Sequence, residues 1–117
     1  MKELKVIEVV ENFIKFENGV KLYSEHDQDC CETHYLSFED LSLDDFNGLT
    51  FDLSGESFFN RIPGYGIALI PNNGFPVRIP GYGWNNGYYS SDLNLMLSDD
   101  NSFEKFFDIS ECQNIEG

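Results

Sequence analysis

The stretch that decides the fold is RIPGYGIALIPNNGFPVRIPGYG, residues 61–83, which begins and ends with the same six residues. Between the two copies, GIALI and FPVRI flank PNNG, and an Asn-Gly pair between two apolar runs is a strong signal for a β-hairpin. If Ile70 lies opposite Phe75, antiparallel pairing puts Gly66 opposite Ile79. We then expect both PGYG sequences to form turns at the same end of the sheet.

The duplication allows two interpretations, and the residues leave both open. It can serve backbone geometry alone, because two similar turns use Pro and Gly at the same positions. It can also build a small aromatic pocket with guanidinium groups that clamp an anionic or planar, nucleotide-like ligand by stacking and bidentate contacts. The candidate ligand-binding residues are Arg61, Tyr65, Arg78, Tyr82 and Trp84.

Other segments of the chain also carry strand signals. Asn-Gly pairs recur at residues 18–19, 47–48 and 86–87, and the first of them predicts a hairpin in ENFIKFENGVKLYSEH. LKVIEVV, CCETHYLSF, LTFDLS and GYYSSDLNLMLS have the apolar patterns of further strands. Ser37, with Asp40 three residues later, predicts a short helical turn that stops at Asn47. SFEKFFDISECQ fits a short helix that runs into a strand.

These patterns predict one domain, residues 1–117, of the α+β class. The chain has 117 residues, 41% of them hydrophobic, and eleven Phe, which is enough for a core. We expect a mainly antiparallel β-sheet of about six or seven strands, in line with common sheet sizes. The sheet is expected to be curled or barrel-like, with one or two short helices.

The charge of the chain restricts its partners. A net charge of −14 argues against direct binding to nucleic acid or to anionic membranes, whose phosphates would be repelled, and favours a protein partner with a basic surface. Ten acids and no Lys or Arg lie between Lys21 and Arg61, whereas residues 57–91 contain no acid. The acidic face that we expect to bind the partner consists of Asp27, Asp29, Glu39, Asp40, Asp44 and Asp45.

The cysteines and histidines suggest one metal site and no other cofactor. His26, Cys30 and Cys31 could ligate zinc, although their spacing differs from the usual zinc pattern. Catalysis by either thiol is disfavoured because the neighbouring acids raise a thiol pKa. Three Cys do not suggest a disulfide framework, no apolar run reaches the ~20 residues of a membrane span, and the N-terminus does not read as a signal peptide. We therefore expect a cytoplasmic protein.

Two motifs resemble a known group of proteins. HDQDCCETHYLSFEDL (residues 26–41) and PGYGWNNGYYSSDLNLML (residues 80–97) resemble a family of small uncharacterised proteins of phages, prophages and other bacterial mobile elements. The shared features are QDCCE after a histidine and a Gly-rich turn that runs into NNGYYS. The resemblance implies an accessory protein inside a bacterial host and supplies no catalytic residue.

The function we expect is binding rather than catalysis. By analogy, small acidic phage proteins can cover the nucleic-acid-binding clefts of host defence proteins or sequester signalling nucleotides. The leading hypothesis is an acidic protein that inhibits such a host protein. The alternatives are a small-ligand binder that uses the two PGYG turns and a metal-binding protein that uses the His/Cys cluster. The oligomeric state stays open.

Overall fold

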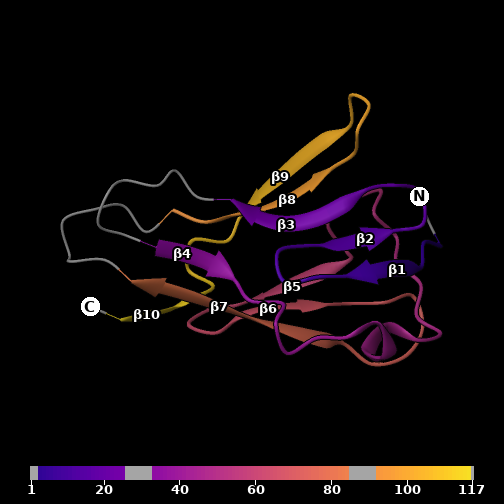
Figure 1. Ribbon diagram of the computed structural model, residues 1–117. Coiled ribbons are helices and arrows are strands. Elements are labelled where there is room, and N and C mark those ends of the chain that lie inside the picture. Colours follow the sequence, from indigo (N-terminus) through magenta and orange to yellow (C-terminus); the bar gives the residue numbers. More distant parts are fainter. Residues whose placement is uncertain (1–2, 26–32, 85–91, 117) are drawn as a thin grey trace.

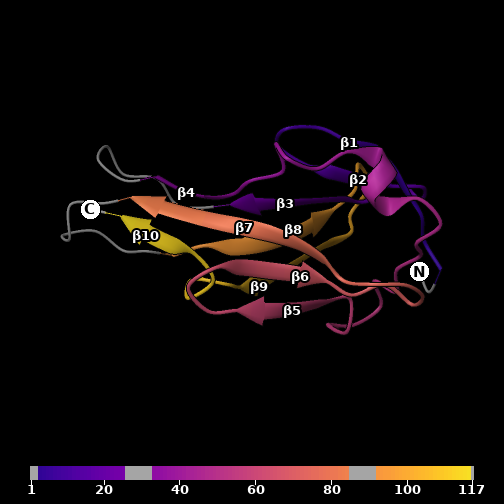
Figure 2. The same ribbon diagram turned by 90° about the horizontal axis from the view of Figure 1, so that it is seen from below.

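Two β-sheets packed face to face make up the fold in the computed structural model, which describes residues 3–25, 33–84 and 92–116 (Figure 1, Figure 2). The elements in these residues are β1 (Val6–Val9), β2 (Ile14–Phe16), β3 (Lys21–Glu25), β4 (Thr33–Leu36), η1 (Leu43–Phe46), β5 (Phe59–Ile62), β6 (Gly66–Leu69), β7 (Val77–Trp84), β8 (Asn94–Ser98), β9 (Glu104–Asp108) and β10 (Asn114–Glu116). Within the described residues, no helix is long and apolar enough to cross a membrane.

The first sheet has the strand order β1-β2-β3-β8-β9, and all of its pairs are antiparallel. The hairpin predicted around residues 18–19 is confirmed, since Ile14 pairs with Leu22 and Gly19 has a φ of 91°. Such a positive φ is what an Asn-Gly turn supplies at low cost. The predicted strand in LKVIEVV is β1, and the one in GYYSSDLNLMLS is β8.

The second sheet is built around β7, the longest strand. Its order is β10-β7-β6-β5, with β4 also paired to β7. All pairs are antiparallel except that of β10 with β7, which is parallel. The predicted hairpin between the two RIPGYG copies is confirmed as β6 and β7, but its register is shifted by one residue. Gly66 pairs with Pro80, and Ile67 rather than Gly66 lies opposite Ile79.

The two RIPGYG copies do not have the same structure. Residues 61–66 form the end of β5 and a turn into β6, in which the Tyr65 N–H donates to the Ile62 carbonyl at 3.0 Å. Residues 78–83 lie within β7 and form no turn, so the expectation of two equivalent PGYG turns is wrong. The second copy stays extended because β6 pairs with residues 78–80 of it, while β4 pairs with residues 81–83 and β10 with residues 82–83.

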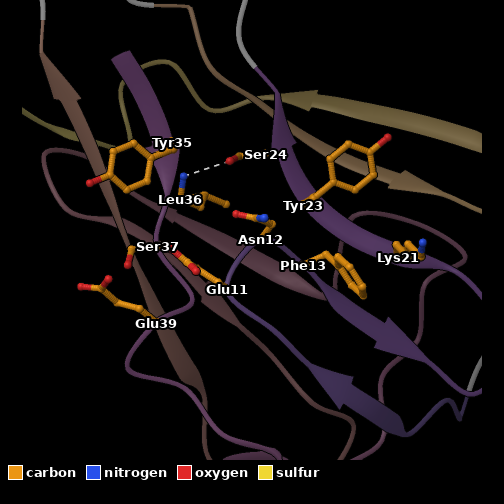
Figure 3. Close-up of a pocket in the computed structure, with 10 residues that line it drawn as sticks. All are labelled: Glu11, Asn12, Phe13, Lys21, Tyr23, Ser24, Tyr35, Leu36, Ser37 and Glu39. Atoms are coloured by element: carbon orange, nitrogen blue, oxygen red, sulfur yellow. Dashed lines mark hydrogen bonds between the residues drawn. The ribbon is translucent and has the colours of Figure 1, made fainter.

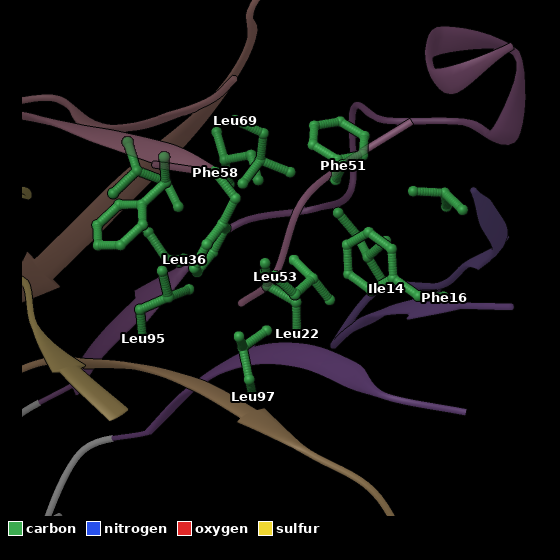
Figure 4. Close-up of a cluster of buried hydrophobic side chains, with 14 of the residues drawn as sticks. Ile14, Phe16, Leu22, Leu36, Phe51, Leu53, Phe58, Leu69, Leu95 and Leu97 are labelled. Carbon is green, nitrogen blue, oxygen red and sulfur yellow. The ribbon is translucent and has the colours of Figure 1, made fainter. Parts of the chain in front are cut away.

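The core lies between the two sheets (Figure 4). Leu22, Leu95 and Leu97 project into it from the first sheet, and Leu69 and Leu36 project from the second. All five are buried. Burying each side chain of this kind contributes about 1.5–3 kcal/mol. The alternation of residues along each strand therefore divides the side chains into a core set and a solvent set.

The expectation of an α+β fold with a curled or barrel-like sheet is wrong in its finer points. The described residues contain no α-helix, and nine strands form two antiparallel sheets that do not close, with β10 added in parallel. The helical turn predicted from Ser37 is the 3-10 helix η1, which begins six residues later. Its capping residues are Ser42 and Asp45 rather than Ser37 and Asp40.

Two further segments differ from their predicted structure. The C-terminal segment expected to start as a helix forms strand β9, in which Phe107 packs on Phe58 at 5.6 Å while Phe106 faces solvent. These Phe residues have the spacing expected of a helix, but they lie on an edge strand whose side chains alternate between the core and solvent. LTFDLS forms only an isolated bridge between Phe51 and Leu4, although Phe51 is buried as expected.

Candidate functional site

The acidic segment, residues 38–48, carries four exposed carboxylates on a firmly held piece of chain. Phe38 and Phe46 are buried in the core and anchor its two ends. Between them, the Ser42 N–H donates to Asp45 Oδ2 at 2.8 Å and fixes the start of η1. The carboxylates of this segment are Glu39, Asp40, Asp44 and Asp45, and all four residues are exposed. The segment therefore presents a negative surface.

A groove of about 550 Å³ runs between the acidic segment and the start of β7. Asp40 and Asp45 line it from the acidic segment, and Leu49 lines it from the chain that follows. The opposite wall includes Phe75 and Arg78. The lining of the groove thus combines apolar side chains with two carboxylates and a single guanidinium.

The rim of the groove carries the most exposed large apolar side chain of the described residues, Phe75, which is 88% exposed. The loop that bears it is pinned to residues 48–50 by hydrogen bonds. The Asn72 N–H donates to the Thr50 carbonyl at 2.7 Å, and Asn73 Nδ2 donates to the Gly48 carbonyl at 2.8 Å. The Thr50 N–H in turn donates to Asn73 Oδ1 at 3.0 Å. Phe75 follows this hydrogen-bonded part of the loop, and its side chain is exposed to solvent.

A second hollow, the cleft, lies where β3 of the first sheet meets β4 of the second (Figure 3). Its volume is about 420 Å³. The Leu36 N–H donates to Ser24 Oγ at 3.0 Å and ties β4 to β3 at its base. Tyr23 and Tyr35 contribute their rings from these strands. Glu11 comes from the β1–β2 turn.

The acidic segment separates the cleft from the groove. Ser37 lines both hollows, Glu39 lines the cleft, and Asp40 lines the groove. Carboxylates from one short stretch of sequence thus reach two adjacent depressions.

Of the four predicted ligand-binding residues whose side chains the structure describes, two lie in one hollow. Tyr65 and Arg78 line the groove. Tyr82 instead packs on Tyr35, with 5.8 Å between the ring centres. The side chain of Trp84, the last residue of β7, lies outside the described part of the chain. Arg61 lies elsewhere, because cross-strand pairing puts Arg61 in line with Ile67 and Ile79, whereas Arg78 pairs with Ala68 on the other face.

Arg61 joins the two sheets at the edge formed by β5 and β9. Its Nε donates to the Asp108 carbonyl at 2.9 Å, and its guanidinium lies 5.2 Å from the centre of the Phe59 ring. The pKa of the Asp108 carboxyl is held below its usual value, mainly by the hydrogen bond that the Ser110 hydroxyl donates and also by the Arg61 charge. Arg61 therefore has a structural role, because its side chain connects β5 with β9.

The predicted metal site, His26, Cys30 and Cys31, lies outside the described residues, as do Asp27 and Asp29 of the predicted acidic face. Within the described part, no group of three or more His, Cys, Asp or Glu residues could hold a metal ion. His34 Nδ1 is hydrogen-bonded to Gln113 Oε1 at 2.7 Å in a buried pair. Cys112 is fully buried, and this burial raises the pKa of its thiol.

Sequence reasoning missed the cleft and the exposure of Phe75. Glu11, Tyr23 and Tyr35 belong to three separate segments, and only the meeting of β3 with β4 brings them together. Phe75 looked like a strand residue of FPVRI. The available signal in the sequence is the glycine before it, Gly74. In the structure Gly74 has a φ of 88°, which is typical of a turn, and β7 begins only at Val77, so Phe75 lies outside the sheet.

Comparison with other proteins adds no assignment. The chain matches no protein-family model, no curated protein and no solved structure. The resemblance carried by QDCCE and NNGYYS therefore stays a prediction, and the function is argued from the site alone.

Proposed function

We propose that this protein is a non-enzymatic binding protein that docks its acidic segment and groove onto a basic protein surface. The observation that carries the proposal is the position of Phe75, an exposed aromatic side chain on a pinned loop beside Asp40 and Asp45. Aromatic side chains that fill a partner's pocket are the usual energetic centres of protein interfaces. The carboxylates beside it select a partner of positive charge.

The class of partner follows from charge and context. A net charge of −14 speeds association with a basic surface and makes the binding sensitive to salt. Because the sequence resembles proteins of phages and mobile elements, the partner that we propose is a host protein that binds nucleic acid. Its basic cleft would accept the acidic segment in place of a phosphate backbone. The protein would then act as an inhibitor of host defence inside the bacterial cell.

A small anionic ligand in the groove is the second candidate, because Tyr65 and Arg78 share that groove. The same groove is lined by Asp40 and Asp45. Two carboxylates beside one guanidinium repel a nucleotide more than the guanidinium attracts it. The Arg78→Ala variant separates the candidates, since it abolishes binding of an anionic ligand but leaves binding of a basic protein intact or stronger. Zinc binding at His26, Cys30 and Cys31 stays a separate prediction.

The proposal is tested by capture followed by a salt titration. Immobilised wild-type protein and a blank matrix are exposed to bacterial lysate, and proteins held only by the wild type are purified. We expect their affinity to fall by about 30-fold in Phe75→Ala, the loss typical of an interface hot spot, and to fall steeply between low and high salt.

The Phe106→Ala variant is the matched control. Phe106 is also an exposed Phe, at 67%, but it lies on β9 and outside the groove. Its loss should leave the affinity unchanged. Equal losses in the two variants, or an affinity that does not depend on salt, would rule out the proposed surface.

A further inference from the structure

The cleft has the lining of a site for a cationic side chain. Two acidic residues, Glu11 and Glu39, and two tyrosines, Tyr23 and Tyr35, line one hollow of about 420 Å³, with the two phenol rings at its opposite ends (Figure 3). The volume is within the range of small-molecule sites, roughly 300–1,000 Å³. Phenol faces attract cations through the ring quadrupole, and carboxylates accept their N–H groups. Neutral apolar or anionic groups would gain neither interaction.

Both rings are held in place before any ligand arrives. The Tyr23 hydroxyl is hydrogen-bonded to Ser98 Oγ at 3.1 Å, which fixes its ring against β8. The Tyr35 ring packs on Tyr82, 5.8 Å between centres. Because these contacts restrict the rotamers of both residues, little side-chain entropy is lost when a ligand packs against either ring.

The charges of the cleft leave its carboxylates available. Neither Glu11 nor Glu39 forms an ion pair within the described part of the chain. Lys21 also lines the cleft, but its ammonium lies 4.8 Å from the centre of the Phe13 ring. With Glu11, Glu39 and Lys21 counted together, the lining of the cleft carries a net charge of one negative unit.

We propose that the cleft receives an arginine side chain of the basic partner. This inference rests on the proposed function, because it names the group that the partner inserts beside the acidic segment. A guanidinium is favoured over an ammonium because its plane stacks on a tyrosine ring while its N–H groups reach a carboxylate. The aliphatic part of the arginine lies along Phe13, which also lines the cleft.

The test uses a defined probe rather than the partner. N-acetyl-L-arginine amide is titrated into the isotope-labelled full chain, and amide chemical shifts are followed by nuclear magnetic resonance. We expect saturable shifts at cleft residues such as Ser24 and Glu39. N-acetyl-L-citrulline amide has nearly the same shape without the charge, and we expect it to bind at least about tenfold more weakly.

Two charge variants locate the site. Glu39→Gln should weaken binding of the arginine probe at least about tenfold. Asp44→Asn makes the same change of charge in the acidic segment but outside the cleft, and it should leave the affinity within about twofold. Equal effects of the two variants, equal binding of citrulline, or shifts that do not saturate would each overturn the inference. The spectra themselves report whether either variant is folded.

The outcome is separable from that of the proposed function. If the arginine probe fails while a basic partner still binds in a Phe75-dependent, salt-sensitive manner, only the cleft inference falls. If the probe binds but no salt-sensitive partner is found, the cleft is an arginine site and the proposed function falls.

Discussion

The two copies of RIPGYG are identical in sequence, but the glycine that follows the proline is needed for a different reason in each copy. In the first copy, Gly64 has a φ of 75° in the turn between β5 and β6, and a Cβ there would meet open space. In the second, Gly81 lies within β7 without a positive φ, and a Cβ there would collide with the Cys112 carbonyl. The first copy needs glycine because its backbone adopts a positive φ, and the second needs glycine because a side chain would not fit.

The difference arises from the strands around each copy. The first copy lies at the sheet edge, because β5 pairs only with β6. The second runs through the middle of its sheet, where the Ser37 N–H donates to the Pro80 carbonyl at 2.9 Å and the Gly81 N–H donates to the Tyr65 carbonyl at 2.6 Å. Pairing on both sides keeps an otherwise turn-forming sequence extended, so tertiary context overrides local preference.

The largest expected difference between the copies lies at the isoleucine. Ile79 in the second copy is fully buried, whereas Ile62 in the first is only partly buried. Ile79→Ala should lower the free energy of unfolding by about 4 kcal/mol through lost burial and a cavity. Ile62→Ala should lower it by about 1 kcal/mol. Urea unfolding of both variants checks this, and equal losses would mean that the second copy is not the core strand.

The next difference concerns the glycines. Gly81→Ala should destabilise the fold by about 3 kcal/mol, because its methyl group must displace the backbone at Cys112. Gly64→Ala meets no neighbour and should cost only the left-handed conformation, about 1–2 kcal/mol. Thermal unfolding ranks the two variants. If Gly64→Ala were the more damaging, packing against Cys112 would not be what Gly81 protects.

Local signals predicted the parts of the fold that neighbours in sequence determine. The Asn-Gly turn at Gly19 and the alternation of Leu93, Leu95 and Leu97 were sufficient for their strands. The parts that were wrong depend on distant contacts. Nothing in RIPGYG shows that β4 and β10 will flank its second copy, and nothing in SFEKFFDISECQ shows that Phe107 will pack on Phe58 across the core.

The site divides in the same way. Charge alone predicted the acidic segment, because Asp40, Asp44 and Asp45 cannot be buried without partners, and these residues are exposed. Charge and composition could not separate Arg61 from Arg78, since their roles depend on strand register. Nor could they predict the cleft, which requires segments from the β1–β2 turn, β3 and β4 to meet.

The smallest expected difference is between the arginines, and it tests the assignment of structural and binding roles. Arg61→Ala removes the hydrogen bond from Nε to the Asp108 carbonyl and should lower the free energy of unfolding by about 1 kcal/mol. Arg78→Ala changes an exposed side chain at the groove and should alter stability by less than about 0.5 kcal/mol. Chemical denaturation measures both. A loss in Arg78→Ala as large as in Arg61→Ala would show that Arg78 also supports the fold, and its effect on ligand or partner binding would then have to be corrected for unfolding.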